Sequence, residues 1–507
     1  MIMTHSTEVH QLYQQLLKKY QKIVLLNNVN WLVSWDMDTF MPSRAADQKS
    51  RQLAFLSELI HKRKTGSKIG SFLQKLKKSK KYNTLGEDEQ RNIALIRREY
   101  DRLTKIPASL IHEFSKQKAK TYDIWRKKAK PNADFEALKP ELEKLVELVK
   151  KRAYHLNPDK KVLDVLMDIH EPGLNLNLLN SVFKEVKAGL IPLMNACVNS
   201  PHQPDLSLIH RHCPKAIQRK VGLDQMEIVQ YIGGRLDESV HPITYGYYDD
   251  VRITTRYHEN DFTDCFYSIM HESGHALYKQ NFPEEYKYQP IGSSCSGGMH
   301  EGQARFIENM IGRNPAFWEF YLPRFKRLTG KIFEDVKLEP FVHAINHVQP
   351  SKTRVSADEV SYTLHLIFRM EIEEQLFAEK ITVEELPSLW NEKMKEYFDI
   401  EIENDTEGVL QDIHWPYAAF GYFPNFAFGN IYGGQLLWQL KQDLPNWLEE
   451  LRTGNLSPII SWLVTNVHQK GALLDPQELI KQITGREVSP KYFLEYLEEK
   501  YSKLYDL

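Results

Sequence analysis

Apolar residues recur at three- and four-residue spacing along most of this 507-residue chain, which is the spacing that places them on one face of an α-helix. Polar residues fill the positions between them, so each apolar stripe faces away from a polar one. Two stripes illustrate the pattern: Leu12, Leu16, Tyr20 and Ile23 in the first, and Val360, Leu364, Ile367 and Phe368 in the second. The spacing predicts an all-α, mainly helical protein.

No feature of the sequence separates independent domains. The chain has no repeat of fixed period, which disfavours solenoid folds, and no low-complexity linker. Its length alone would allow two or three domains. We expect a single domain spanning residues 1–507.

The composition is that of a soluble globular protein, with 42% hydrophobic and 26% charged residues. No apolar run approaches the roughly 18 residues that would span a bilayer, so a membrane role is disfavoured. The N-terminal sequence lacks the basic and apolar segments of a secretory signal, which predicts a cytoplasmic protein. The four cysteines form no paired motif, and we expect buried free thiols.

The net charge of -1 offers no general attraction for nucleic acid. The main exception is the basic cluster KLKKSKKY at residues 75–82, which an acidic stretch follows directly. No aromatic stacking pattern accompanies this cluster. The sequence therefore predicts a solvated helix end there, and no nucleic-acid partner.

Residues 249–261, DDVRITTRYHEND, depart from the helical pattern and alternate with a period of two, which predicts a strand. One face carries charged and polar residues and the other is mostly apolar: Asp250, Arg252, Thr254 and Arg256 on the first, and Val251, Ile253, Thr255 and Tyr257 on the second. The Asp250 and Arg252 pair could support a neighbouring site as an ion pair, or lie along a bound peptide backbone. We favour the supporting role.

A helix is expected directly after this strand, with Asn260 or Asp261 as its cap and the segment from Asn281 to Pro283 as its end. It contains His-Glu-Ser-Gly-His at residues 271–275. Residues four apart lie on one helical face, so His271 and His275 can both bind one zinc ion. Glu272 can then act as a general base on a water that the metal acidifies. Two ordinary core histidines would give the same pattern.

A catalytic zinc site needs a third protein ligand. The segment 293–314 predicts a second helix, which Ser296 caps and Gly312 ends, with an apolar face formed by Met299, Phe306, Ile307 and Met310. His300 and Glu301 fall in its first turns. If the two helices pair in antiparallel fashion, either residue could complete the site, and spacing does not choose between them.

Five motifs together resemble the carboxypeptidase Taq family of zinc metallocarboxypeptidases, which is related in fold to angiotensin-converting enzyme, thimet oligopeptidase and neurolysin. In chain order they are DVRIT (250–254), HESGH (271–275), HEGQ (300–303), TRVSAD (353–358) and GVLQDIHW (408–415). The likeness extends to SWDMDTFMPSRAADQ (34–48) and SPKYFLEYLEEKY (489–501). Thr353 departs from the aliphatic residue usual in the family.

The resemblance implies a helical fold with a small β-element beside the active site and a deep substrate cleft, part of whose wall is formed by helices within roughly residues 1–130. It implies that His271, His275 and Glu301 bind Zn2+, for which Co2+ or another divalent metal could substitute, and that Glu272 is the base. His300 is then either a helper near the site or an ordinary helix residue. A homodimer is also implied.

Arg354 is the candidate for binding the terminal carboxylate of a peptide, because the planar guanidinium suits that group. Ser356 and Glu359 have the spacing of a capping box, which predicts a helix start just after Arg354. Pairing of Arg354 with Asp358 or Glu359 on the surface is the alternative.

The resemblance to related helical zinc peptidases suggests His414 and Tyr422 as hydrogen-bond donors to the oxyanion of the transition state. A buried aromatic cluster is the alternative there, formed by Trp415, Tyr417, Phe420 and Phe423. Gln411 and Asp412 are expected to orient neighbouring side chains.

The resemblance implies a zinc metallocarboxypeptidase that releases single amino acids from peptide C-termini with broad specificity. An oligopeptidase or dipeptidyl carboxypeptidase could use the same metal site, but a carboxylate anchor one residue beyond the cut favours the first activity. A non-catalytic helical scaffold is the alternative from another class. It leaves the intact set of His271, Glu272, His275 and Glu301 unexplained.

Overall fold

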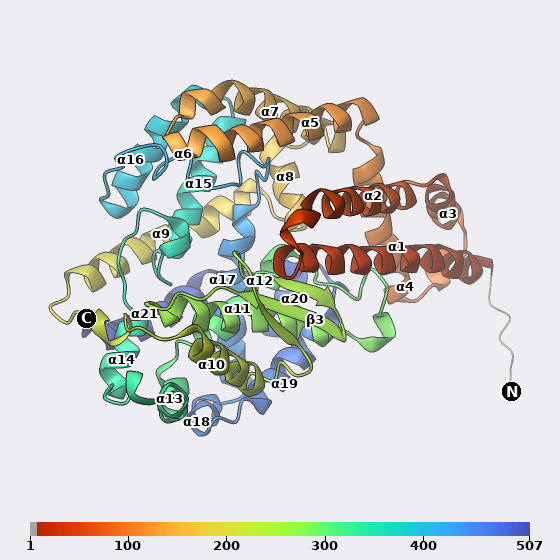
Figure 1. The fold of residues 1–507 in the computed structure, drawn as a ribbon. Helices are drawn as coiled ribbons and strands as arrows, with labels where there is room; N and C mark the ends of the chain where they lie inside the picture. Colours follow the sequence, from red (N-terminus) through yellow and green to blue (C-terminus); the bar gives the residue numbers. More distant parts are fainter. Residues whose placement is uncertain (1–7) are drawn as a thin grey trace, which may run out of the picture. The chain divides into compact units, whose positions relative to one another are not determined.

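The computed structural model describes residues 8–507, of which helices form the large majority (Figure 1). The only β-structure in this range is a sheet of three short strands. This confirms the predicted fold class, mainly helical with a small β-element. No helix within residues 8–507 is long and apolar enough to cross a bilayer.

The chain divides into two compact units, each built from three separate segments. The first unit comprises residues 8–105, 212–295 and 455–474, and the second comprises 106–211, 296–454 and 475–507. That residues 1–507 form one catalytic domain, with N-terminal helices in a cleft wall, stays a prediction.

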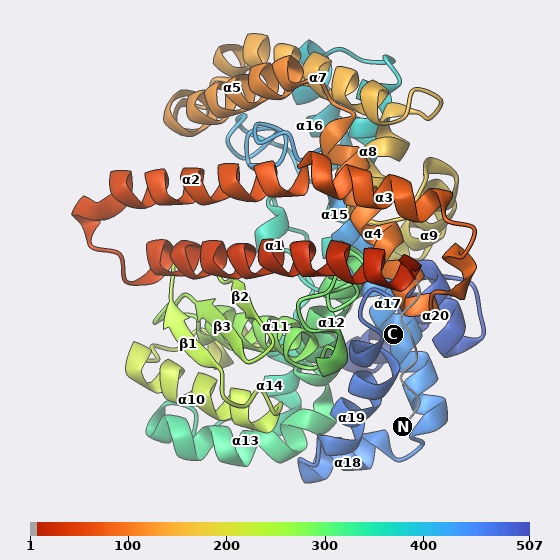
Figure 2. The ribbon, with the colours of Figure 1, turned by 90° about the vertical axis from the view of Figure 1, so that its right-hand side faces the viewer.

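The first unit contains seven α-helices and the three strands of the described chain. These are α1 (Glu8–Thr39), α2 (Ala46–Lys64), α3 (Ser67–Lys78), α4 (Glu87–Thr104), α10 (Lys215–Ile228), α11 (Phe262–Gln280), α19 (Ser457–Asn466), β1 (Arg235–Glu238), β2 (Thr244–Tyr247) and β3 (Asp250–Thr255). Helices α1 and α2 lie side by side (Figures 1 and 2). Leu16 and Ile23 of the predicted stripe are buried in the core that α1–α4 share, with Leu12 and Tyr20 packed against it.

The sheet has the order β1-β3-β2, with β1 parallel and β2 antiparallel to β3. The predicted strand is shorter than expected and ends at Thr255. Thr254 is fully buried, so the predicted polar face holds only for Asp250 and Arg252. Burial of Thr254 is tolerated because its hydroxyl accepts from Ile243 N (2.9 Å) and donates to His241 O (3.1 Å).

The second unit contains helices and connecting loops but no strand within residues 106–211, 296–454 and 475–507. Its α-helices are α5 (Ala108–Ile124), α6 (Lys130–Asn132), α7 (Phe135–Leu156), α8 (Val162–His170), α9 (Leu176–Asn199), α12 (Gly297–Arg305), α13 (Pro315–Thr329), α14 (Leu338–Ile345), α15 (Tyr362–Phe377), α16 (Leu386–Phe398), α17 (Phe423–Asp443), α18 (Trp447–Thr453), α20 (Pro476–Thr484) and α21 (Lys491–Tyr505). Helix α17 is central, since it packs against α12, α15, α20 and α21.

Helix α15 does not expose the polar residues that lie opposite its apolar stripe. Its predicted stripe is buried, but so are His365, Arg369 and Glu373 on other faces, each with 0% of its surface exposed. Burial of such groups requires partners. Arg369 and Glu373 have them, in hydrogen bonds to residues 411–421.

Two smaller predictions are confirmed. All four cysteines are free and buried. The lysines of the basic cluster at 75–82 are exposed at the end of α3 and in the turn that follows it.

Candidate metal centre

Helix α11 carries His-Glu-Ser-Gly-His and has the predicted boundaries. The side chain of Asp261 accepts a hydrogen bond from Thr263 N at its start, and the helix stops at Gln280, just before Asn281. Between these ends the helix is buried on most sides, including Glu272 and His275, whereas His271 is partly exposed. This burial fixes the backbone that presents the two histidines.

Helix α12 carries Glu301 and also has the predicted boundaries. Ser296 caps it by accepting from Met299 N (2.9 Å), and its last turns widen into a π-helix, Phe306–Ile311, that ends before Gly312. Gly298 N donates another hydrogen bond in this turn, to the carboxylate of Glu171 at 2.8 Å. Glu171 was not identified from the sequence. Two side chains thus hold the first turn of α12.

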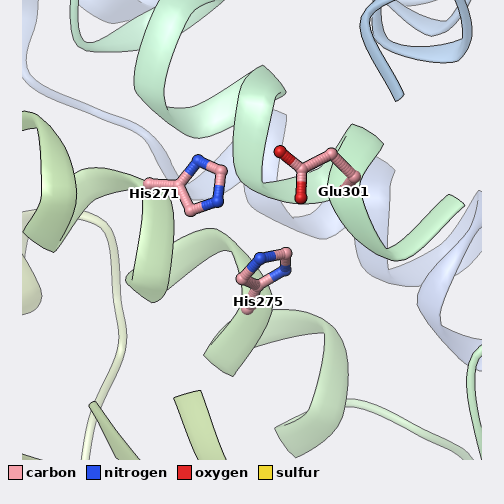
Figure 3. Close-up of side chains that lie close together, drawn as sticks. All are labelled: His271, His275 and Glu301. Atoms are coloured by element: carbon pink, nitrogen blue, oxygen red, sulfur yellow. The ribbon is translucent and has the colours of Figure 1, made fainter. Parts of the chain in front are cut away.

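His271, His275 and Glu301 each offer one potential ligand atom, and these atoms lie within 4.8 Å of one another (Figure 3). Two imidazole nitrogens and one carboxylate oxygen are a donor set that catalytic zinc sites use, with the fourth position open. His300 is not a member of this group. The residues present therefore fit a divalent metal such as zinc.

Arg305 holds the carboxylate of Glu301 from one helical turn further along α12. Its Nε donates to Glu301 Oε1 at 3.1 Å, and its Nη1 donates to Glu308 Oε2 at 3.1 Å. Burial opposes the charge on Arg305, but Glu308, Tyr362 and Glu301 more than offset it and raise the pKa of the guanidinium. The i, i+4 spacing of Glu301 and Arg305 is a sequence signal that could have identified this contact.

Thr244 of β2 contacts the candidate base. Its Oγ1 donates to Glu272 Oε2 at 2.6 Å and also lies 3.0 Å from the backbone oxygen of Glu272. Lys279 Nζ donates to Thr244 O at 2.8 Å, so the hydroxyl and the backbone carbonyl of Thr244 are both hydrogen-bonded to α11. No sequence signal marks Thr244, because the pairing joins residues 28 positions apart across a strand and a helix.

The backbone around Arg354 differs from the prediction. Arg354 opens a short 3-10 helix, η8 (Arg354–Ser356), and α15 begins only at Tyr362. The expected capping box is wrong, since Asp358 accepts from Val360 N and Ser361 N instead. Glu359 is recruited elsewhere, to side chains of α21: Tyr496, Lys500 and Tyr501.

Arg354 pairs with Asp412 and with neither of the acids considered in the sequence. Its Nη2 donates to Asp412 Oδ1 (3.2 Å) and its Nη1 to Tyr362 Oη (3.2 Å). Arg369 Nε donates to the other oxygen, Asp412 Oδ2, at 2.6 Å, and Arg369 Nη2 to Gln411 Oε1 at 2.7 Å. Burial would raise the pKa of Asp412, but the two arginines hold it well below its usual range. These contacts agree with the orienting role expected of Gln411 and Asp412.

His414 and Tyr422 lie together, with ring centroids 5.9 Å apart and an interplanar angle of 29°. Burial lowers the pKa of His414, although Asp412, whose Oδ1 is 3.6 Å from His414 Nδ1, opposes this shift. Burial raises the pKa of Tyr422, and the charge of Glu301 adds to the effect. At neutral pH the imidazole is therefore neutral and the phenol keeps its proton.

The aromatic cluster considered for this segment is present in part, and the donor role of His414 and Tyr422 stays a prediction. Trp415, Phe420 and Phe423 are buried, whereas Tyr417 remains 47% exposed. The buried part of this cluster is in contact with His414, since the His414 and Phe423 ring centroids are 4.5 Å apart.

Asp250 and Arg252 form the ion pair that was one of the two expectations for the strand. Arg252 Nε donates to Asp250 Oδ1 at 2.7 Å, and its guanidinium lies 4.2 Å from the ring centroid of Trp35 on α1. These contacts join β3 to α1 within the first unit.

A sequence profile of the carboxypeptidase Taq (M32) metallopeptidases matches residues 15–501. The chain belongs to this family. Carboxypeptidase 1 of Bacillus subtilis is 36% identical over 501 residues, covering 98% of this chain and 99% of its own length. Thermostable carboxypeptidase 1 of Thermus thermophilus is 35% identical over 505 residues, covering 97% and 99% respectively.

Solved structures of metallocarboxypeptidases are similar to this chain along almost its whole length. An M32 carboxypeptidase from Deinococcus radiodurans R1 superimposes with a TM-score of 0.95 at 31% identity, covering 98% of this chain and 100% of that one. Metallocarboxypeptidase 1 of Trypanosoma cruzi gives a TM-score of 0.92 at 31% identity, covering 97% and 99% respectively. As an M32 family member, the protein is a metal-dependent peptide hydrolase of the carboxypeptidase type.

Proposed function

We propose that this M32 protein is a zinc-dependent carboxypeptidase that removes single amino acids from peptide C-termini with broad specificity. The observation that carries the proposal is the group formed by His271, His275 and Glu301, with Glu272 beside the first histidine on α11. A cytoplasmic location and a homodimer are part of the proposal.

His271, His275 and Glu301 would hold the metal, and Co2+ or another divalent ion with the same geometry could replace zinc. A bound zinc ion acidifies water and polarises the scissile carbonyl. Arg305 donates a hydrogen bond to one oxygen of the Glu301 carboxylate. This arrangement orients the ligand in the way that outer-shell partners do.

Glu272 takes the proton from the attacking water and passes it to the leaving amine. The hydroxyl of Thr244 donates to Oε2 of this carboxylate and so restrains its orientation. Because Glu272 is buried, with 6% of its surface exposed, bulk water does not compete for the transfer.

Arg354 binds the terminal carboxylate of the substrate. Its side chain and that of Arg369 share a single counter-charge, Asp412, so the cluster of three keeps one positive charge. The buried Nε–H of Arg354 has no acceptor among residues 8–507. A carboxylate ligand would supply both the missing acceptor and the missing charge.

His414 and Tyr422 donate hydrogen bonds to the oxyanion that forms during attack. A neutral imidazole and a protonated phenol are both able to donate, and the directions of their pKa shifts favour these forms. Such donors strengthen as negative charge develops, so they accelerate the chemical step more than they improve binding.

Product mapping on a peptide of five or six residues tests the proposal, with and without a chelator and after adding zinc back. We expect stepwise loss of single C-terminal residues that stops with chelator and returns with zinc. Release of C-terminal dipeptides or internal cleavage would favour a dipeptidyl carboxypeptidase or an oligopeptidase. Absence of any hydrolysis by metal-loaded protein would favour the scaffold alternative.

A further inference from the structure

Helix α1, the end of α2 and the start of α3 line a pocket of about 610 Å³ in the first unit. Its cationic lining residues are Lys18, Lys19, Lys22, Lys62, Arg63 and Lys68, and none of the acidic residues within 8–507 lines it. Figure 2 shows the three helices that contribute. The volume is within the range of about 300–1,000 Å³ that small-molecule sites occupy.

The positive charge in this pocket is not neutralised by the protein. Lys62 pairs with Glu58, but the other five cations form no ion pair with any residue from 8 to 507. Two other lysines of α2, which do not line the pocket, are paired: Lys49 with Asp36 and Lys64 with Glu99. The pocket is thus a local surplus of positive charge.

The N-terminal segment as a whole also contains more basic than acidic residues, and an excess of acidic residues in the rest of the chain balances this. The first 105 residues contain 20 lysines and arginines but 10 aspartates and glutamates, although the complete chain has 66 and 67. A concentration of one sign of charge in a concave surface attracts ligands of the opposite sign.

The start of α3 strengthens this argument. Gly66 caps the helix without a side chain, and its first turn contains no acidic residue. The free N–H groups and the helix dipole at this end favour an anion, and they disfavour the cation that stands there, Lys68. A bound anion would offset the unfavourable interaction between Lys68 and this helix end. Among the cations that line the pocket, only Lys62 and Arg63 are placed favourably for a helix dipole, because they lie in the last turn of α2.

We propose that this pocket binds a soluble anion with a chain of phosphates, such as inorganic tripolyphosphate or the phosphate end of a nucleoside triphosphate. Several lysines spread over a pocket of this size suit several linked phosphates better than one, since each ammonium acts as a point charge. Phe72 and Ile69 give the pocket an apolar side, on which a base could rest. The proposal does not depend on the peptidase activity.

Calorimetric titration of the full chain with magnesium tripolyphosphate, magnesium ATP, AMP and inorganic phosphate tests it. Magnesium complexes are used so that the ligands do not remove a metal from His271, His275 and Glu301. We expect tripolyphosphate to bind at least tenfold more tightly than inorganic phosphate. Tighter binding of ATP than of tripolyphosphate would identify a nucleotide as the source of the phosphates, and equal binding would identify the phosphate chain alone.

The combined variant Lys18→Gln, Lys22→Gln and Lys68→Gln should lower the affinity at least tenfold. The matched control is Lys75→Gln, Lys77→Gln and Lys78→Gln, which removes the same charge from exposed lysines of α3 outside the pocket. It should change affinity less than threefold. Equal losses in both variants, or no binding of tripolyphosphate at millimolar concentration, would overturn the proposal. So would binding of RNA or of anionic vesicles without binding of tripolyphosphate.

Discussion

Thr244 donates a 2.6 Å hydrogen bond from its Oγ1 to Glu272 Oε2. The donor belongs to an outer strand of the small sheet, and the acceptor is the candidate base on α11. The sheet therefore contributes directly to the candidate site, because it restrains one oxygen of the residue proposed to move the proton.

Replacing Thr244 by Val keeps the shape of the side chain but removes this donor. A hydrogen bond to a charged group contributes about 1.5–3 kcal/mol, so we expect kcat to fall about tenfold or more, with KM little changed. Steady-state kinetics on one peptide measure the effect. Thr244→Ser keeps the hydroxyl and should retain most of the activity. A Val variant as active as the wild type would show that Glu272 does not need this restraint.

Glu272→Gln separates metal binding from proton transfer. The amide keeps the size of the carboxylate but cannot accept a proton, so turnover should fall at least a thousandfold. Metal content, measured by mass spectrometry after dialysis, should stay at the wild-type value because Glu272 is not among the three proposed ligands. Hydrolysis near the wild-type rate would remove Glu272 from the role of base, and loss of metal would make it a ligand.

Local sequence patterns predicted the elements that local interactions determine. Helix α11 starts at Asp261 and α12 at Ser296, as expected, because a capping side chain and the N–H that it accepts from are close in sequence. The Asp250–Arg252 ion pair was foreseeable for the same reason, since the two residues are two positions apart on one strand.

The errors came from partners distant in the sequence. The capping box failed because Glu359 is held by Tyr496, Lys500 and Tyr501 of α21, more than 130 positions away. The polar face expected on α15 is buried because Arg369 finds Asp412, 43 positions further on. Periodicity records which residues are polar, but it contains no information about such partners.

Tyr422→Phe should lower kcat about a hundredfold and leave KM nearly unchanged, because loss of an oxyanion donor affects the transition state alone. The substitution removes only the hydroxyl and keeps the ring that lies against His414 and His170. Tyr417→Phe is the control, since Tyr417 is exposed. A change in KM without a change in kcat would make Tyr422 a residue that binds substrate uniformly, and His414→Phe offers an independent test of the same pair.

Glu171 gives the protein a predicted dependence of stability on pH. Burial raises the pKa of its carboxyl to about 7, against the hydrogen bonds from Tyr432 and Gly298. A raised pKa means that the folded state keeps a proton that the unfolded chain releases. The stability that this proton contributes is therefore complete below about pH 4.5 and is lost as pH rises through 7.

Urea unfolding of the wild type and of Glu171→Gln between pH 5 and 8 measures this contribution. The amide can still accept from Gly298 N and can donate to Tyr432 Oη, so the variant should fold. The difference in free energy of unfolding between the two proteins should change by about 2 kcal/mol over this range, because only the wild type titrates. Parallel curves for the two proteins would show that Glu171 does not titrate there.

Arg354 is the residue proposed to bind the C-terminal carboxylate, and Arg354→Lys tests that role while keeping the positive charge. Lysine cannot offer the planar pair of N–H groups, so kcat/KM for peptides with a free C-terminus should fall about 10- to 100-fold. C-terminally amidated peptides, which lack the carboxylate, should be cleaved slowly and equally by both enzymes. Lys352→Gln is the control, because it removes a nearby cation that pairs with Glu403 and Glu407. If Arg354→Lys slowed both classes of peptide equally, the residue would serve the structure around Asp412, and the enzyme would recognise the peptide end by other means.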